Sequence, residues 1–318
     1  MPSLTLLQVF ESVLPVFILA GVGVILRKVE WLTQEADESL IRVVVNVLTP
    51  CLIFDRVLNN DALKRPENLL VPPVMGFLGI AVGIGLCWVF RRRIGLKSDA
   101  EQRTFALVAG LQNYGYVPFP LILQLFPEET TGVLFVHNLG VDIAMWSLGL
   151  ITLGHVGGFK AWRRLLNAPI LSILTALALN GVRAQEVMPH SLLTSISMLG
   201  KCAFPLGLVL SGATMADQSR EFRSSQTIRV VAWASLLRLG LIPVVLLAMA
   251  KWLPVSIELR RVLAIEAAMP AAVFPVVMAR QYGGHPATAV RIVIGTSFVG
   301  LVTIPLWIRA AIGWLGLS

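Results

Sequence analysis

The residue types best suited to bind an anion lie in a polar stretch, residues 112–120, inside an otherwise apolar segment. A helix that crosses a membrane must satisfy its own backbone hydrogen bonds, and the two prolines of this stretch remove donors. We therefore expect the helix to break here. Non-helical backbone at bilayer depth is tolerated where it lines a cavity, so Asn113, Tyr114, Pro120 and the freed amides are candidate contacts for a carboxylate. The alternative is that Asn113 only caps a half-helix.

A second break is expected in residues 266–275, late in the chain. It contains Pro270 and Pro275, and the small residue Ala271 follows the first proline. Small side chains leave room for a substrate, so these three residues are also candidate contacts. The alternative is that they only let another helix approach closely. We interpret the two breaks as the two halves of one transport site.

Glu266 lies about one turn before Pro270, well inside an apolar segment. An ionisable group at that depth is costly, which makes it a functional candidate by default. We expect Glu266 to carry a coupling proton or sodium ion. The structural alternative is an ion pair with a neighbouring cation such as Arg238.

Lys201 and Asn46 stand four residues before Pro205 and Pro50, in the middle of two apolar segments. A lysine ammonium near the crossing could neutralise a substrate carboxylate. We therefore expect Lys201 and Asn46 to face the substrate. The alternative for Lys201 is a fixed ion pair with a buried acid.

Three further polar residues fall within apolar segments. Arg238 cannot lose its proton and needs a partner, and we expect it to form a structural ion pair with Glu266 or Asp142. Asp142 shares a helix face with Asn138 at i, i+4 spacing, and His137 lies slightly to one side. Asp142 and His137 are candidates for the coupling-ion path. The simpler alternative is that His137 is only hydrogen-bonded in place.

The elements that position these residues must lie in a membrane. The 318 residues are 56% hydrophobic and 14% charged, whereas a soluble domain carries roughly 25% charged residues. Segments of about 20 apolar residues are long enough to span a bilayer as helices. The expected spans are 4–26, 40–58, 69–90, 104–126, 131–154, 165–182, 192–216, 227–253, 262–282 and 287–314.

The net charge of +8 arises mainly from Lys and Arg in short connections between spans. This pattern indicates membrane topology and not a nucleic-acid partner. The first, third, fifth, seventh and ninth connections hold 14 basic residues, against eight in the even connections and the C-terminal end. We therefore expect the odd connections in the cytoplasm, both termini outside it, and a bacterial inner-membrane location.

Several chemistries are not supported. The three cysteines form no CxxC pair and have no zinc-type spacing with His, which argues against disulfides and a metal site. Phosphate-binding Gly-rich loops, HExxH helices and GxSxG elbows are absent from the sequence. We expect no enzymatic activity and no cofactor beyond a possible coupling H⁺ or Na⁺.

Prolines recur at a nearly constant offset in the two halves of the chain, which divides it into two five-helix units, 1–155 and 165–318. Because each unit has an odd number of spans, the second enters the membrane upside down relative to the first. The expected fold is an all-α membrane protein with ten transmembrane helices in a 5+5 inverted repeat. The pairs are Pro15 and Pro169, 154 positions apart, and Pro50 with Pro205 and Pro120 with Pro275, each 155 apart.

The combination of four motifs resembles the auxin efflux carrier family over essentially the whole chain. The motifs are Asn113 with Pro120, Met269-Pro270 with Pro275 and Ala279-Arg-Gln-Tyr-Gly283, Asn46-Val-Leu-Thr-Pro50-Cys-Leu-Ile-Phe54, and Gly200-Lys-Cys-Ala-Phe-Pro205-Leu206.

The resemblance implies that broken helices four and nine cross at mid-membrane. It also implies a scaffold of helices 1, 2, 6 and 7, a mobile core of helices 3–5 and 8–10, and a homodimer formed through the scaffold. Plant members use an Asn matching Asn113 to contact substrate, but place a polar residue where this chain has Ala271. Glu266 resembles in position a sodium-binding Glu of the related bile acid:sodium symporters.

The expected function is secondary active transport of small organic anions by an elevator mechanism. Dicarboxylates such as malate and malonate fit, as do monocarboxylates, including auxin-like acids. One alternative is a sodium-coupled symporter or cation/proton antiporter on a similar fold. A more distant one is a membrane sensor or interaction protein that has kept the carrier scaffold.

Overall fold

The computed structural model describes residues 6–155, 166–218 and 227–317, so the basic residues expected at 156–165 and 219–226 lie outside the described residues. Within those ranges the chain is helical apart from turns, short connections and one isolated antiparallel bridge between Gln112 and Ala271. The chain has the all-helical fold class that its sequence predicts.

Six helical segments of the described chain are long and apolar enough to cross a membrane, so the chain is a multi-pass integral membrane protein. Three of them consist of several consecutive helical pieces. The six segments are α1 (Leu6–Lys28), α4 (Glu67–Phe90) with η3 (Arg91–Ile94), α7 (Glu129–Ala144) with η4 (Met145–Gly149) and α8 (Leu150–Thr152), α11 (His190–Gln218), α12 (Thr227–Leu236) with η7 (Leu237–Leu241) and α13 (Ile242–Trp252), and α16 (Pro286–Leu315).

The other expected spans are built from shorter helices. One is interrupted by a π-helical turn, one is a single short helix, and two are split by a non-helical break. These are α2 (Gln34–Val43) with η1 (Val44–Leu48) and α3 (Thr49–Leu58), α10 (Ala168–Gly181), α5 (Asp99–Gly110) with α6 (Pro118–Leu125), and α14 (Ile257–Ala268) with α15 (Phe274–Gln281).

The sequence fixes where α5 begins through a capping box. The Ser98 hydroxyl accepts a hydrogen bond from the Glu101 amide at 3.1 Å, and the Glu101 carboxylate accepts one from the Ser98 amide at 2.9 Å. Two of the free amides at the helix start are thereby satisfied. The capping box therefore fixes the first residue of α5, the half-helix that leads to the first break.

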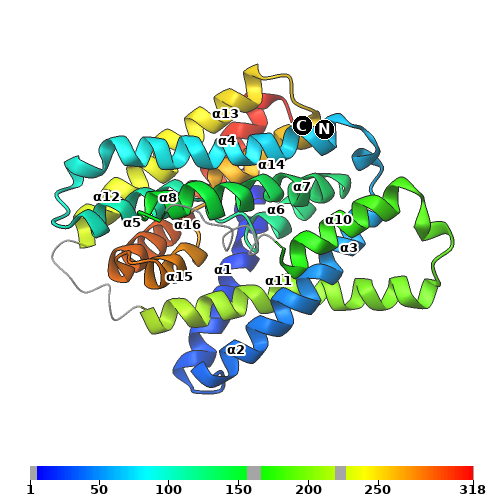
Figure 1. Ribbon diagram of the computed structural model, residues 1–318, viewed down its shortest axis with the longest axis horizontal. Helices are drawn as coiled ribbons and strands as arrows, with labels where there is room; N and C mark the ends of the chain where they lie inside the picture. Colours follow the sequence, from blue (N-terminus) through cyan, green and yellow to red (C-terminus); the bar gives the residue numbers. More distant parts are fainter. Residues whose placement is uncertain (1–5, 156–165, 219–226, 318) are drawn as a thin grey trace.

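The helices pack in two groups (Figure 1). In the first group, α1 lies along α11, and α3 packs against both α10 and α11. In the second, α4 packs against α7 and α5, while α14 contacts α7, α13 and α16. The two groups meet where α1 contacts α16 and α6 and where α3 contacts α7.

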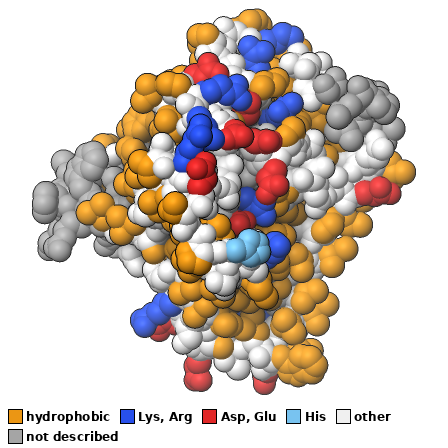
Figure 2. Space-filling model, turned by 90° about the vertical axis from the view of Figure 1, so that its right-hand side faces the viewer, with side chains coloured by type: hydrophobic (Ala, Val, Ile, Leu, Met, Phe, Trp, Pro, Cys, Tyr) orange, Lys and Arg blue, Asp and Glu red, His pale blue; other side chains and the backbone are white. Residues whose placement is uncertain are grey.

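Every second connection along the chain meets the others of its set at one end of the molecule. This end faces the viewer in Figure 2, where acidic and basic side chains gather beside hydrophobic ones. The contacts are Arg65 with Glu258 at 2.6 Å, Asn60 with the Glu129 carbonyl at 2.9 Å, Asn180 with the Asn60 carbonyl at 3.0 Å, and Lys251 with the Trp314 carbonyl at 2.7 Å.

The alternate connections meet in the same way elsewhere. They are linked to one another by hydrogen bonds, an ion pair and one ring contact, so the first, third, fifth, seventh and ninth connections lie together. The contacts are Arg27 with Asp217 at 3.2 Å, Arg229 with the Arg93 carbonyl at 3.5 Å, Thr104 with the His285 amide at 2.8 Å, and the rings of His155 and Tyr282, whose centroids are 5.3 Å apart.

Candidate functional site

The two helix breaks cross and satisfy each other's backbone. The Asn113 amide donates to the Pro270 carbonyl at 2.8 Å, and the Ala272 amide donates to the Leu111 carbonyl at 3.0 Å. These bonds flank the bridge between Gln112 and Ala271. Backbone groups freed by the prolines would be costly without partners inside a bilayer, and the two breaks supply those partners reciprocally.

Prolines lie in the first turn of both half-helices that follow the breaks. Pro118 and Pro120 lie in the first turn of α6, and Pro275 lies in the first turn of α15. All three are buried. Proline is favoured in a first helical turn, where amides lack intrahelical partners. Pro120 and Pro275 therefore fix where the half-helices start, with their positive ends near the crossing.

Polar side chains of α7 hold the first break. The Asn138 side-chain amide donates to the Tyr114 carbonyl at 2.8 Å, and the Tyr114 hydroxyl donates to the Asp142 carboxylate at 2.7 Å. Asn138 and Asp142 lie one turn apart, on the shared face that the sequence predicts. His137 is buried, with Nδ1 3.3 Å from Asn138 Oδ1, which is the contact expected by the simpler of its two interpretations.

Asn113 is partly exposed at the break. Its side-chain oxygen accepts a hydrogen bond from the Gly115 amide at 3.4 Å, a turn that Asn readily forms with its own backbone. This bond uses the carbonyl of the side chain. It is the type of local contact that the capping interpretation expects, while the partial exposure is what a substrate contact requires.

Arg238, in η7, reaches the first break from a neighbouring helix and is fully buried. Its Nη1 donates to the Gln112 side-chain oxygen at 3.4 Å and to the Gly110 carbonyl at 3.5 Å. Gln112 is 1% exposed. The guanidinium therefore lies against the end of α5 and the first residues of the break.

Glu266, near the end of α14, is fully buried beside the same group. It lies within electrostatic reach of Arg238 and next to the Gln112 side chain. Across the described ranges, however, neither carboxylate oxygen has a hydrogen-bond partner, and Arg238 forms no ion pair within 4.0 Å of Glu266 or Asp142. The expected direct ion pair is not formed, because the guanidinium is directed to Gln112 and the Gly110 carbonyl instead.

A close backbone approach places the Gly110 carbonyl. A Cβ on Gly83 of α4 would lie 2.1 Å from the Gly110 oxygen, and one on Gly110 would lie 2.6 Å from the Ile84 backbone. Only glycine at both positions permits this contact. The packing of α4 on α5 therefore holds the end of α5 independently of Arg238.

Among the described residues, neither Lys201 nor Asn46 forms a hydrogen bond or an ion pair with the two breaks. Both side chains are exposed, and the Asn46 amide donates to the Arg42 carbonyl at 2.9 Å. The face of α11 that meets the break carries Gly207, where a Cβ would lie 2.4 Å from the Tyr116 ring. Six positions at 100° each place Lys201 about 120° around the helix from that face.

Two residues of the site have no place in the expectations drawn from the sequence. Gln112 is the first residue of the polar stretch, which marks it as unusual in an apolar segment. Its partner Arg238 lies 126 positions away, so the sequence does not indicate their contact. Thr296 of α16 accepts a hydrogen bond from the Ala271 amide at 3.2 Å. A threonine in an apolar helix gives no signal of such a contact.

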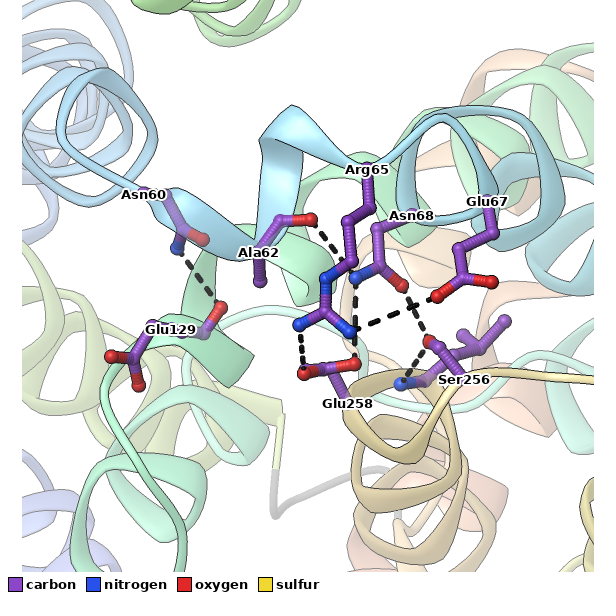
Figure 3. Close-up of polar contacts among 9 residues, drawn as sticks. Asn60, Ala62, Arg65, Glu67, Asn68, Glu129, Ser256 and Glu258 are labelled. Carbon is purple, nitrogen blue, oxygen red and sulfur yellow. Dashed lines mark hydrogen bonds and ion pairs between the residues drawn. The ribbon is translucent and has the colours of Figure 1, made fainter.

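A second polar cluster lies at the end shown in Figure 2, outside the expected 262–282 span. Arg65 pairs with Glu258, and the Asn68 amide donates to Glu258 at 3.4 Å and to the Ala62 carbonyl at 3.0 Å (Figure 3). Ser256 donates to the Asn68 side-chain oxygen and caps α14. The cluster joins the start of α4 to the start of α14.

Hydrogen bonding governs the ionisation of Glu258. Burial opposes the charged form, but hydrogen bonds from the Glu258 backbone amide, Arg65 and Asn68 outweigh it and hold the pKa of Glu258 below its usual value.

A cavity of about 410 Å³ opens beside this cluster. It is lined by Asp61, Ala62, Arg65, Pro127, Glu129, Thr130, Glu258 and Arg261.

Comparison with known proteins shows which family the chain is similar to. A family model described as "Membrane transport protein" matches residues 8–159 and 152–308. An uncharacterized transporter of Methanothermobacter thermautotrophicus is 28% identical over 303 residues, covering 93% of this chain and 96% of the relative. One of Methanocaldococcus jannaschii is 25% identical, covering 97% and 99%, and the transporter YfdV of Escherichia coli is 20% identical, covering 93% and 96%.

The match extends from α1 into α16 and includes both helix breaks, so it does not depend on one motif. The relatives that are similar over nearly their whole length are named as transporters, and none of those names refers to an enzyme. The chain therefore belongs to the membrane transport protein family, the auxin efflux carrier family that its motifs indicated.

Proposed function

We propose that the chain is a secondary carrier of small organic anions and that the substrate carboxylate binds where the two breaks cross. The observation that carries this proposal is the reciprocal pairing of Asn113 with Pro270 and Ala272 with Leu111. It brings the positive ends of two half-helices close to the partly exposed Asn113 and Tyr114. Such a site suits a mono- or dicarboxylate, with malate, malonate and auxin-like acids as candidates.

The proposed topology is ten membrane crossings arranged as an inverted repeat, residues 1–155 and 165–318. Two observations support it. Every second connection meets at the same end, as expected when each helix crosses in the opposite direction to the one before. Pro118 and Phe274, the first residues of α6 and α15, are 156 positions apart, close to the proline offset.

We propose an elevator mechanism in which a core moves against a scaffold. The scaffold would consist of α1, α2 with α3, α10 and α11, and the core would hold both breaks. The separate packing of these two groups supports the division. The substrate bound at the crossing would be carried from one side of the membrane to the other, while the scaffold stays fixed.

A homodimer would form through the scaffold. Lys201 and Asn46 support this arrangement, because both lie in the middle of scaffold spans and are exposed in the single chain. A charged group facing lipid at that depth is costly, so a second copy or a water-filled passage is needed to cover Lys201. We place the carrier in a bacterial inner membrane with its termini outside the cytoplasm, on the distribution of Lys and Arg.

One observation favours a second function, a sodium-coupled symporter or cation/proton antiporter. Both oxygens of the buried Glu266 are without hydrogen-bond partners among the described residues. A buried carboxylate of this kind is a typical ligand for a transported cation or proton. The two functions differ in whether an organic acid is needed for ion movement.

The test is transport by the purified protein in proteoliposomes. Labelled malonate, malate and indole-3-acetate would be offered one at a time, with and without a sodium or proton gradient. Saturable uptake of an acid that Asn113→Ala weakens supports the carrier. The second function would replace the organic-anion carrier if sodium or protons move without any organic acid and Glu266→Gln abolishes that movement.

A further inference from the structure

The group around Arg238 is built from oxygen atoms of both broken segments. The Gly110 carbonyl and the Gln112 side-chain oxygen lie 3.5 and 3.4 Å from Nη1, and the Glu266 carboxylate lies nearby. The carbonyl belongs to the negative end of α5. Backbone carbonyls at such half-helix ends, together with amide and carboxylate oxygens, are the ligands that alkali cations prefer.

The charges of this group are balanced but loosely bonded. Arg238 and Glu266 are fully buried and Gln112 is nearly so. Among the described residues, Nε and Nη2 of Arg238 and both oxygens of Glu266 are without hydrogen-bond partners. Each buried charge would be strongly destabilising without the other. The guanidinium therefore serves mainly to supply positive charge to oxygens that it does not fully ligate.

The Gly110 carbonyl and the Gln112 backbone do not depend on the guanidinium for their positions. The Gly83 and Gly110 backbones fix the end of α5, and the bridge between Gln112 and Ala271 fixes the start of the break. Shortening Arg238 would leave the same oxygens around space that a small cation can enter.

We propose that Arg238 is a tethered cation that fills an alkali-cation site at the crossing. The site would take Na⁺ once the guanidinium is removed, with Gly110, Gln112 and Glu266 as its ligands. In the native chain the guanidinium excludes sodium from this position. One consequence of this proposal rests on the proposed function. If the chain transports organic acids, their uptake should proceed without a sodium gradient.

The experiment measures thermal unfolding of the purified full-length protein in NaCl, KCl or choline chloride at constant ionic strength. The native chain and Arg238→Lys should show no sodium-specific shift. Arg238→Ala should unfold at a lower temperature and recover saturably with Na⁺, by about 2–4 °C at ten times its Kd. Adding Glu266→Gln to Arg238→Ala should abolish that recovery.

Leu237→Ala is the matched control. Leu237 precedes Arg238 and is 2% exposed, so its truncation destabilises the same turn without opening the oxygen group. It should respond equally to Na⁺ and choline.

A sodium-specific, saturable shift in the native chain would overturn the proposal, even if Arg238→Ala does not fold. So would an Arg238→Ala response no larger than that of Leu237→Ala. These measurements need no substrate. If the protein transports no organic acid in proteoliposomes, the proposed function is wrong. The sodium response of Arg238→Ala would still hold.

Discussion

The Asn113 amide and the Pro270 carbonyl, which belong to different broken helices, are joined by a 2.8 Å hydrogen bond. Each break thereby satisfies part of the backbone that the other leaves open. This bond and its neighbour between Ala272 and Leu111 join the break between α5 and α6 to the break between α14 and α15. A substrate bound at that point would contact both breaks together.

Asn113→Ala should weaken carboxylate binding about 10- to 100-fold, because a hydrogen bond to a charged group contributes about 1.5–3 kcal/mol. Titration calorimetry with the acid that the proteoliposome assay identifies would measure the loss. Asn59→Ala, at an exposed position after α3, is the control and should bind normally. Equal affinities in the two variants would show that Asn113 only forms the local hydrogen bond with Gly115 and does not contact the substrate.

Gly83→Ala should destabilise the protein by about 1–3 kcal/mol, the usual cost of overpacking. The added Cβ would lie 2.1 Å from the Gly110 oxygen, and both atoms are held by backbone. Gly85→Ala is the matched control, since a Cβ there has no atom within 4 Å, and it should be neutral or stabilising. Thermal unfolding would compare them; similar losses would show that α4 and α5 do not pack this closely.

Gln112→Met should cost about 1–3 kcal/mol, because it removes one of the acceptors of a buried guanidinium while keeping the side-chain volume similar. Gln124→Met, at an exposed position of α6, should change stability little. The difference in unfolding free energy between the two variants is the measurement. A Gln112 variant as stable as its control would mean that Arg238 does not depend on the break.

Glu258→Gln should alter the acid side of the stability profile. The pKa of Glu258 is lower in the folded chain than in the unfolded one, so the unfolded state binds more protons as pH falls. The stabilisation is fully present above the unfolded pKa of about 4.3 and is lost as pH falls through the folded pKa.

The glutamine variant should lack that part of the pH dependence, as measured by thermal unfolding between neutral and acidic pH. Glu35→Gln, an exposed glutamate in the first turn of α2, should keep it. Parallel profiles for the native chain and Glu258→Gln would contradict the assigned role of the contacts with Arg65 and Asn68.

The positions of both breaks could be predicted from the sequence. Proline lacks an amide and fixes φ, and these are local properties that act wherever the residue stands. The i, i+4 relation of Asn138 and Asp142 follows from helix geometry in the same way. The sequence predicts that Arg238 pairs with Glu266 or Asp142, but it could not predict that the guanidinium donates to Gln112 and the Gly110 carbonyl, because several acceptors compete for one guanidinium and only their positions in space decide between them.

The sequence by itself determined that the chain lies in a membrane, where its helices break and which family it belongs to. Composition, proline positions and motifs carry that information residue by residue. Only the tertiary structure decided that Gln112 meets Arg238, that Arg65 meets Glu258 across 193 positions, and that Lys201 is exposed. The rotation of a helix about its axis and the pairing of distant segments depend on how whole helices pack, and no local pattern specifies them.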